Sequence, residues 1–255
     1  MRKITLIALS LMLVFAASCA KKSTRTAAPT GAYDPDAAFR RANELVDKKQ
    51  YEAARREFDT IKGRDTEGIY TPLAHLRIAD TYILEKEYDP AVVEYRRFIE
   101  FYPDHKYASY AQYKIGMIYF DQIEDAERGN DAARRALEEF YKLNALYPRN
   151  PYRETLVYYV EKCRDIISEY GFMVGNFYFK KNAYEAAAGR YLEVLNEFPD
   201  FKKEEEAFYK LALSFARMGE VEKARRYLQR LQTEYPESKL AEKAEKEIAK
   251  ADKKG

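Results

Sequence analysis

The chain has few of the residues that most often carry out chemistry. Among 255 residues there are two histidines, two cysteines and no tryptophan. Neither histidine, His75 nor His105, stands at a metal-ligand spacing from cysteines or carboxylates. Glycine-rich phosphate loops and nucleophile-elbow motifs are also missing from the sequence. These absences argue against an enzyme and predict a protein that binds no metal ion or other cofactor.

An excess of charge of one sign is missing as well. The formal net charge is +2, and Arg2 and Lys3 account for it. Without residues 1–18 the chain has 42 basic and 42 acidic residues, interleaved as over 242–254. A nucleic-acid-binding surface needs a concentrated basic patch that neutralises phosphates. We therefore expect no nucleic-acid partner.

Long apolar runs are scarce, and the longest lies at the N-terminus. Two basic residues precede the apolar run 4–17, which is too short for a membrane span and is typical of a signal peptide. The small residues before Cys19 resemble the bacterial lipobox, in which the cysteine becomes the lipidated first residue. We expect a lipoprotein signal peptide over 1–18 and covalent lipid on Cys19, with a plain secretory signal as the alternative. Ala20, where aspartate often causes inner-membrane retention, favours the outer membrane.

The next segment has no apolar periodicity. Residues 19–33 are predicted to be the lipidated cysteine and a flexible tether, and the 14 residues after Cys19 span roughly 20 Å root-mean-square. The tether would hold a folded domain, residues 34–250, on the periplasmic side of the membrane, and 251–255 are expected to be a disordered tail. Cys163 is then the only other cysteine, so it cannot form a disulfide within the chain.

What the chain does have is a repeat. Four times an aromatic residue directly precedes proline, and an alanine stands twelve residues before each proline. The aromatic–proline pairs are Tyr102-Pro103, Tyr147-Pro148, Phe198-Pro199 and Tyr235-Pro236. The alanines are Ala91, Ala136, Ala187 and Ala224. Proline ends a helix, and this pattern is the tetratricopeptide one of paired helices.

The first helix of each pair has its own signature, a small residue where two helices pack most closely. These small residues are Ala42, Ala79, Gly116, Gly175 and Ala212. The first of them belongs to a degenerate repeat over about 34–64 that has no closing proline. The sequence therefore predicts an all-α fold, an α-solenoid of five tetratricopeptide helix-turn-helix repeats.

Two intervals between prolines exceed the usual period of about 34 residues. Pro103 to Pro148 is 45 residues, with a longer turn predicted over 121–131. Pro148 to Pro199 is 51 residues, and its surplus keeps an apolar stripe of helical spacing. We expect one helix over about 151–181, roughly 45 Å long. It would either pack the two halves of the domain together or offer a docking surface.

These features together resemble one family, the BamD lipoproteins of the outer-membrane β-barrel assembly (BAM) complex. The resemblance covers about 33–250 and is strongest in the motif Leu-Tyr-Pro-Arg-Asn-Pro-Tyr over 146–152 and in 183–200. It implies a non-catalytic protein that binds the periplasmic POTRA domains of the barrel protein BamA and receives unfolded outer-membrane protein precursors. Accessory BAM lipoproteins attach in some bacteria.

Two sets of candidate site residues follow. The resemblance assigns the BamA contact to Arg190, together with Tyr184; the alternative for Arg190 is a solvated or helix-paired arginine. Repeat phase places a second set on the concave sides of the first three repeats, where it would form a groove for a precursor's strand signal. This set is Phe39, Leu76, Asp80, Ile83, Tyr110, Tyr113, Met117 and Phe120. The alternative for the groove residues is packing between repeats.

Two other kinds of lipidated repeat protein are alternatives for the function. A secretin pilotin would be expected to show more regular 34-residue units. A coordinator of the Tol system or of peptidoglycan synthesis usually carries a trimerising heptad segment before its repeats, and residues 20–33 show none. The partner recovered from solubilised outer membranes would distinguish the three kinds.

Overall fold

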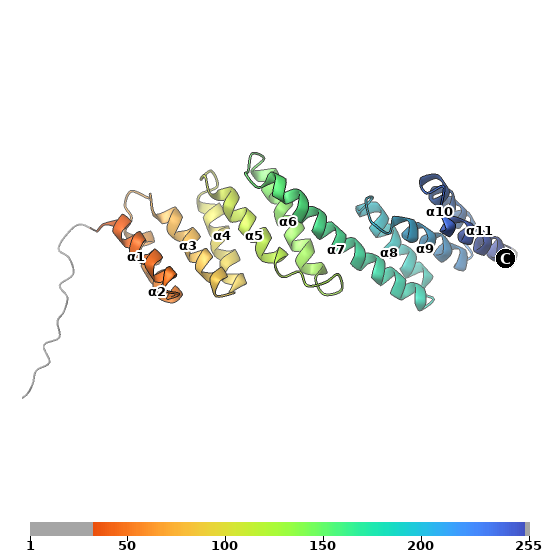
Figure 1. The fold of residues 1–255 in the computed structure, drawn as a ribbon, viewed down its shortest axis with the longest axis horizontal. Helices are drawn as coiled ribbons and strands as arrows, with labels where there is room; N and C mark the ends of the chain where they lie inside the picture. The colour runs from red at the N-terminus through yellow and green to blue at the C-terminus, as the bar shows by residue number, and fades with distance from the viewer. Residues whose placement is uncertain (1–32, 253–255) are drawn as a thin grey trace, which may run out of the picture. The chain divides into compact units, whose positions relative to one another are not determined.

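The structure is a computed structural model that describes residues 33–252, and these fold into helices without any strand (Figure 1). Residues 34–252 belong to one compact unit. The helices of that unit are α1 (Pro35–Asp47), α2 (Tyr51–Arg64), α3 (Thr71–Leu84), α4 (Tyr88–Phe101), α5 (Ala108–Phe120), α6 (Asn130–Leu146), α7 (Arg153–Lys180), α8 (Tyr184–Glu197), α9 (Glu204–Arg217), α10 (Val221–Glu234) and α11 (Lys239–Asp252).

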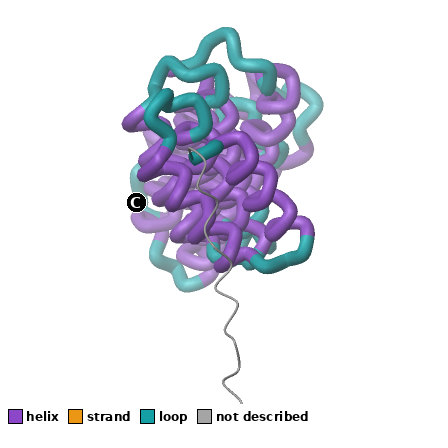
Figure 2. The backbone as a smooth tube through the Cα atoms, turned by 90° about the vertical axis from the view of Figure 1, so that its left-hand side faces the viewer, coloured by secondary structure: helices purple, strands orange, loops and turns teal. Residues whose placement is uncertain are grey.

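Helices α1 to α10 each pack mainly on the helices directly before and after them in the chain. The loops between them gather at the two edges of the helical stack (Figure 2). Contacts restricted to neighbours define a solenoid. The predicted five tetratricopeptide repeats are confirmed as the pairs α1–α2 to α9–α10, and α11 packs on α9 and α10 after the last pair.

Small residues are required where paired helices meet. A Cβ on Gly116 would lie 2.4 Å from Cε1 of Phe140, and a Cβ on Gly175 would lie 2.6 Å from Cε1 of Tyr191. Both rings are fully buried, so neither can move away into solvent. The small-residue signature of the sequence therefore marks real backbone contacts with buried aromatic rings.

The turns also follow the repeat. Helices α4, α6, α8 and α10 each end one residue before the aromatic residue of an aromatic–proline pair. Within four of the five helix pairs, the turn contains one residue of positive φ: Lys49 at 58°, Lys86 at 62°, Asn182 at 60° and Gly219 at 79°. The third pair instead has the longer turn that was predicted, residues 121–129 between α5 and α6.

The long helix α7 has 28 residues, Arg153–Lys180, close to the predicted 151–181. In its first half, the Tyr159 ring lies 4.7 Å from that of Phe120 on α5 and 5.7 Å from that of Phe140 on α6. In its second half, the Phe172 ring lies 5.7 Å from that of Tyr191 on α8. Helix α7 therefore joins the third repeat to the fourth, as the packing alternative expected.

The C-terminal boundary differs slightly from the expectation. Helix α11 continues to Asp252, whereas a tail was expected from residue 251. Its buried side chains, Ala241, Ala244 and Ile248, follow helical spacing and cover the last repeat. Residues 253–255, the predicted signal peptide 1–18, Cys19 and the predicted tether as far as residue 32 lie outside the described residues.

Candidate functional site

Four of the groove candidates surround one pocket. The pocket has a volume of about 350 Å³ and lies on helices α1, α3 and α5, the first helices of three successive repeats. It is lined by Phe39, Leu73, Leu76, Arg77, Asp80, Tyr107 and Tyr110. Phe39, Leu76, Asp80 and Tyr110 were predicted from repeat phase. The pocket is mostly apolar and can hold an apolar or aromatic side chain.

Asp80 organises the polar part of this pocket. Its Oδ1 accepts hydrogen bonds from the hydroxyls of Tyr95 at 2.5 Å and Tyr110 at 3.0 Å. Burial, with the nearby Asp80 charge as the next cause, raises the pKa of both tyrosines far above its usual range. Both hydroxyls therefore stay protonated donors. Arg77 is held beside them, since its Nε donates to Asn43 Oδ1 at 2.8 Å.

Sequence reasoning missed three lining residues. Leu73 and Arg77 each stand three residues before a predicted residue of α3, so helical spacing could have found them. Tyr107 comes directly before α5, outside the helical pattern, and its side chain is 40% exposed. The position of Tyr107 depends on the turn between repeats, which repeat phase does not describe.

The other groove candidates lie elsewhere. The Tyr113 ring stacks on Tyr152 with centroids 4.1 Å apart, and Phe120 packs edge-on against Tyr159 of α7. Met117 is partly buried against the same cluster. Ile83 packs on the cluster formed by α3, α4 and α5. At these four positions the structure favours the alternative, packing residues rather than an open groove.

The two partner candidates lie on the fourth repeat. Arg190 on α8 has a side chain 47% exposed, and its Nη1 lies 2.7 Å from Oε2 of Glu193 on the same helix. Tyr184 begins α8, donates to Asn182 Oδ1 at 2.7 Å and packs against the Phe179 ring. The pair with Glu193 is the helix-paired arrangement considered above. An exposed pair of this kind contributes at most about 1 kcal/mol, so a partner's carboxylate can displace it.

Buried histidine and cysteine side chains do not form a reactive centre. His75 is buried, and its Nδ1 lies 3.5 Å from Oε2 of Glu94, a contact within the second repeat. Cys163 is fully buried, and burial raises the pKa of its thiol to about 12. Among residues 33–252, no three histidine, cysteine, aspartate or glutamate side chains are grouped so that they could hold a metal ion.

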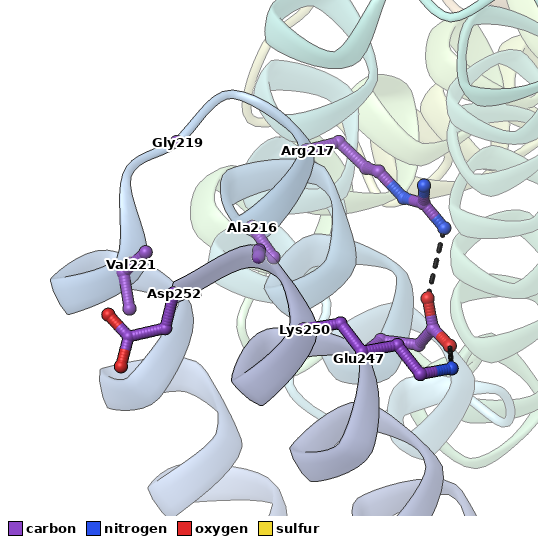
Figure 3. A pocket seen from close by; sticks show the side chains of 8 residues that line it. Ala216, Arg217, Gly219, Val221, Glu247, Lys250 and Asp252 are labelled. Carbon is purple, nitrogen blue, oxygen red and sulfur yellow. Dashed lines mark hydrogen bonds and ion pairs between the residues drawn. The ribbon is translucent and has the colours of Figure 1, made fainter. Parts of the chain in front are cut away.

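A further hollow lies where α9, α10 and α11 meet, and it is lined by charged side chains (Figure 3). Arg217 Nη2 lies 3.1 Å from Oε2 of Glu247, whose other oxygen lies 2.8 Å from Nζ of Lys250. These charged groups pair with one another, and the pair of Arg217 with Glu247 links α9 to α11. In the part of the chain that the structure describes, none of the helices is long and apolar enough to cross a bilayer.

Comparisons with known proteins identify the family of this chain and its repeat. A family model described as "YfiO: Outer membrane lipoprotein" matches residues 32–219, well over half of the chain. The chain belongs to this family. A tetratricopeptide repeat model matches residues 206–238, which include most of α9 and all of α10.

Curated relatives carry the name "Outer membrane protein assembly factor BamD", so the predicted BamD family is confirmed. The Rickettsia prowazekii protein is 28% identical over 195 residues, 76% of this chain and 78% of the relative. The Neisseria meningitidis serogroup A protein is 24% identical over 250 residues, 93% of both chains. The Caulobacter vibrioides protein is 24% identical, and the alignment covers 86% of this chain and 72% of the relative.

Solved structures of tetratricopeptide proteins are also similar. The "TPR2AB-domain:pHSP90-complex of yeast Sti1" is 15% identical, with a TM-score of 0.44, and covers 86% of this chain and 84% of its own. A Bacteroides fragilis protein described as a TPR repeats protein is 13% identical, also with a TM-score of 0.44, and covers 85% of this chain and 98% of its own.

Proposed function

We propose that this chain is the non-catalytic scaffold and substrate-receiving subunit of the BAM complex. In this proposal, α8 binds the BamA POTRA domains, and the pocket of α1, α3 and α5 receives unfolded outer-membrane protein precursors. The observation that carries the proposal is family membership over the repeat domain, together with relatives named as outer-membrane protein assembly factors. Lipid on Cys19 would hold the domain at the outer membrane, facing the periplasm.

The pocket supports the receiving role. Its apolar walls come from the first helices of three repeats, and the lining residue Asp80 accepts a hydrogen bond from the hydroxyl of Tyr110, which also lines the pocket. A peptide with an aromatic end could insert its ring while the remaining chain stays extended, which needs no folding of the peptide. The half-exposed Tyr107 at the rim provides a second ring for stacking.

The receiving role is tested by site-specific photocrosslinking. A photoreactive amino acid at position 107 should capture a peptide that corresponds to the aromatic-ended last strand of a barrel precursor. The same amino acid at Tyr158, an exposed tyrosine of α7 outside this pocket, is the matched control. Equal capture at both positions would contradict a specific pocket.

The exposure of Arg190 supports the BamA contact. A carboxylate of the partner can reach its guanidinium and take the place of Glu193. A planar guanidinium binds a carboxylate through two parallel hydrogen bonds, a geometry that lysine cannot reproduce. Arg190→Glu should therefore abolish co-purification with BamA, and an acid-to-base change on the POTRA side should restore it. Arg226→Glu, at an exposed position of α10, is the control and should leave co-purification unchanged.

Membrane attachment is tested at Cys19. A single acyl chain gives only marginal membrane binding, whereas several chains anchor a protein stably. Cys19→Ser should therefore accumulate as unprocessed precursor or appear as soluble periplasmic protein. Mass spectrometry of the wild-type protein should find lipid on its N-terminal cysteine, and its absence would refute the lipoprotein part of the proposal.

A further inference from the structure

A hollow between two turns of the solenoid has no part in the functions proposed so far. Its volume is about 560 Å³, and it lies between the α4–α5 turn, residues 102–107, and the α6–α7 turn, residues 147–152. The lining residues are His105, Lys106, Ser109, Tyr147, Pro148, Arg149, Asn150 and Pro151. None of these residues is acidic, and we refer to the site as the basic hollow.

The two permanent cations of the basic hollow have no acidic partner. Lys106 and Arg149 are both exposed, and within residues 33–252 neither forms an ion pair with a carboxylate. The Nζ of Lys106 lies 5.0 Å from the centroid of the Tyr107 ring, a contact that leaves its charge uncompensated. Both cations can therefore bind an anion without first giving up an ion pair within the chain.

Other groups of the hollow are hydrogen-bond donors. The backbone N–H of Tyr107 donates to Nδ1 of His105 at 3.2 Å, so the neutral imidazole carries its proton on Nε2. Burial, followed by the Lys106 charge, lowers the pKa of His105 and keeps this ring neutral at pH 7. Ser109 belongs to the first turn of α5, which begins without a side-chain cap. The positive end of that helix dipole therefore lies beside the two cations.

Acidic residues near the hollow reduce its charge without cancelling it. Those nearest in the sequence are Glu100 in the last turn of α4, Asp104 in the first of the two turns and Glu154 in the first turn of α7. Asp104 acts on the Tyr147 side, where its charge adds to burial in raising the pKa of the tyrosine hydroxyl. Lys106 acts on the His105 side. Arg153, directly before Glu154, adds a further cation at the start of α7.

Exposed apolar side chains border the basic hollow. Phe101 ends α4 and Leu146 ends α6, each directly before one of the two turns, and each is 60% exposed. Tyr107 in the first turn is also exposed. Apolar side chains beside basic ones are typical of surfaces that rest on anionic lipid, because the apolar groups enter the headgroup boundary while the cations meet phosphates.

We propose that the basic hollow binds the phosphate of an anionic phospholipid headgroup and holds this edge of the domain against the membrane surface. Lys106 and Arg149 pair with the phosphate oxygens, and Phe101 and Leu146 enter the headgroup boundary. The family is one of outer-membrane lipoproteins, so a lipid surface is near, and the predicted tether of roughly 20 Å keeps the domain within reach of it. A flexible tether cannot set the orientation of the domain, whereas a headgroup site can.

This inference goes beyond the proposed function and requires neither BamA binding nor precursor binding. It is tested on the mature chain, residues 19–255, with Cys19→Ser, so that no acyl chain contributes to membrane binding. Co-sedimentation compares vesicles of phosphatidylglycerol and phosphatidylcholine in equal parts with vesicles of phosphatidylcholine alone. The chain should bind the first kind and not the second.

Removing the two cations gives the quantitative test. A basic residue close to an anionic membrane strengthens binding about fivefold, so Lys106→Ala with Arg149→Ala should weaken binding to the phosphatidylglycerol vesicles about 30-fold. The matched control is Lys48→Ala with Arg226→Ala, which removes the same charge from the α1–α2 turn and from α10, at exposed positions outside the hollow. The control should bind as the unsubstituted chain does, and circular dichroism checks that both variants are folded.

A gain of binding is expected from the opposite change. Asp104→Asn removes the acid of the α4–α5 turn and should strengthen binding to the same vesicles by up to about fivefold. Partial unfolding cannot produce this result through the hollow, because it would separate the two turns. Unchanged or weaker binding by Asp104→Asn would contradict a phosphate held at this place.

The absence of tryptophan from the chain allows a second, independent readout. Phe101→Trp should shift its fluorescence to shorter wavelength when phosphatidylglycerol vesicles are added, because the indole enters the headgroup boundary. Phe177→Trp is the control. Phe177 is 57% exposed near the C-terminal end of α7, away from the two turns, and its indole should keep the emission it has without vesicles.

The outcomes decide between a lipid and other anions. Loss of vesicle binding by the Lys106 and Arg149 variant but not by its control, with the shift at position 101, supports the headgroup site. Equal loss by both double variants overturns it, since net charge alone would then explain binding. Calorimetric binding of inorganic phosphate without vesicle binding overturns the lipid source. Absence of vesicle binding, with weaker BamA co-purification by the Lys106 and Arg149 variant, would make the hollow a protein contact and also overturns the inference.

Discussion

The close contact between α5 and α6 predicts a measurable loss of stability when Gly116 gains one methyl group. An alanine Cβ at this position would lie 2.4, 2.6 and 3.3 Å from three atoms of the Phe140 ring. The ring cannot move outward, because Phe140 is fully buried and packs against Tyr159 and Phe120. Gly116→Ala must therefore push the two helices apart or force the ring away from its preferred rotamer.

Two opposing effects set the magnitude. Replacing glycine by alanine within a helix stabilises it by about 1 kcal/mol. Overpacking a buried contact costs about 1–3 kcal/mol, and the three short distances place Gly116→Ala at the upper end of that range. The expected net effect is a decrease of about 1–2 kcal/mol in the free energy of unfolding. In a domain of this size, that corresponds to roughly 2–8 °C in melting temperature.

Gly189 is the matched control. It also lies within a helix, α8, but a Cβ there would meet no atom within 4 Å. Gly189→Ala should therefore show the helix-propensity gain alone, about 1 kcal/mol. Urea unfolding followed by circular dichroism at 222 nm measures both variants. If Gly116→Ala were as stable as Gly189→Ala, the close approach of α5 to Phe140 would be refuted.

Three further predictions follow from the described contacts. Tyr107→Ser should lower peptide capture without loss of helix, whereas Tyr113→Ser should lower the melting temperature because its ring is stacked within the domain. The contact with His75, whose Nδ1 lies 3.5 Å from Oε2 of Glu94, is the main cause that holds the Glu94 pKa below its usual 4.5. The stabilisation is therefore present above pH 4.5 and is lost as pH falls through the lower folded value. Glu94→Gln should therefore reduce the loss of stability between pH 7 and pH 3 in urea titrations. Cys163 should resist thiol reagents in the folded protein and react in urea, since burial raises its pKa to about 12.

The repeat architecture was accessible from sequence because each repeat places the same side chains in the same environment. The alanines, the glycines and the aromatic–proline pairs each mark a contact or helix end that recurs. The length of α7 could also be predicted, since its apolar stripe continues without interruption. Periodicity within one helix is a local property, and local properties are what a single sequence reveals best.

Repeat phase named only some of the residues that line the pocket of α1, α3 and α5, for a physical reason. Repeat phase states which face of a helix is concave, but it does not state whether another element covers that face. Tyr113 and Phe120 have the phase of groove residues, yet Tyr152 and Tyr159 lie against them because the long α7 packs beside α5.

The continuity of α7 also has a mechanical consequence. Ordinary solenoids lose their repeats one at a time from the ends, because each repeat is held only by its neighbours. Here one helix contributes to the packing of α5, α6, α8 and α9, so the third and fourth repeats must yield together. A force applied through the N-terminus would therefore unfold α1–α4 first and then unfold α5–α8 together. Single-molecule pulling on the chain should show small early steps followed by one large rupture.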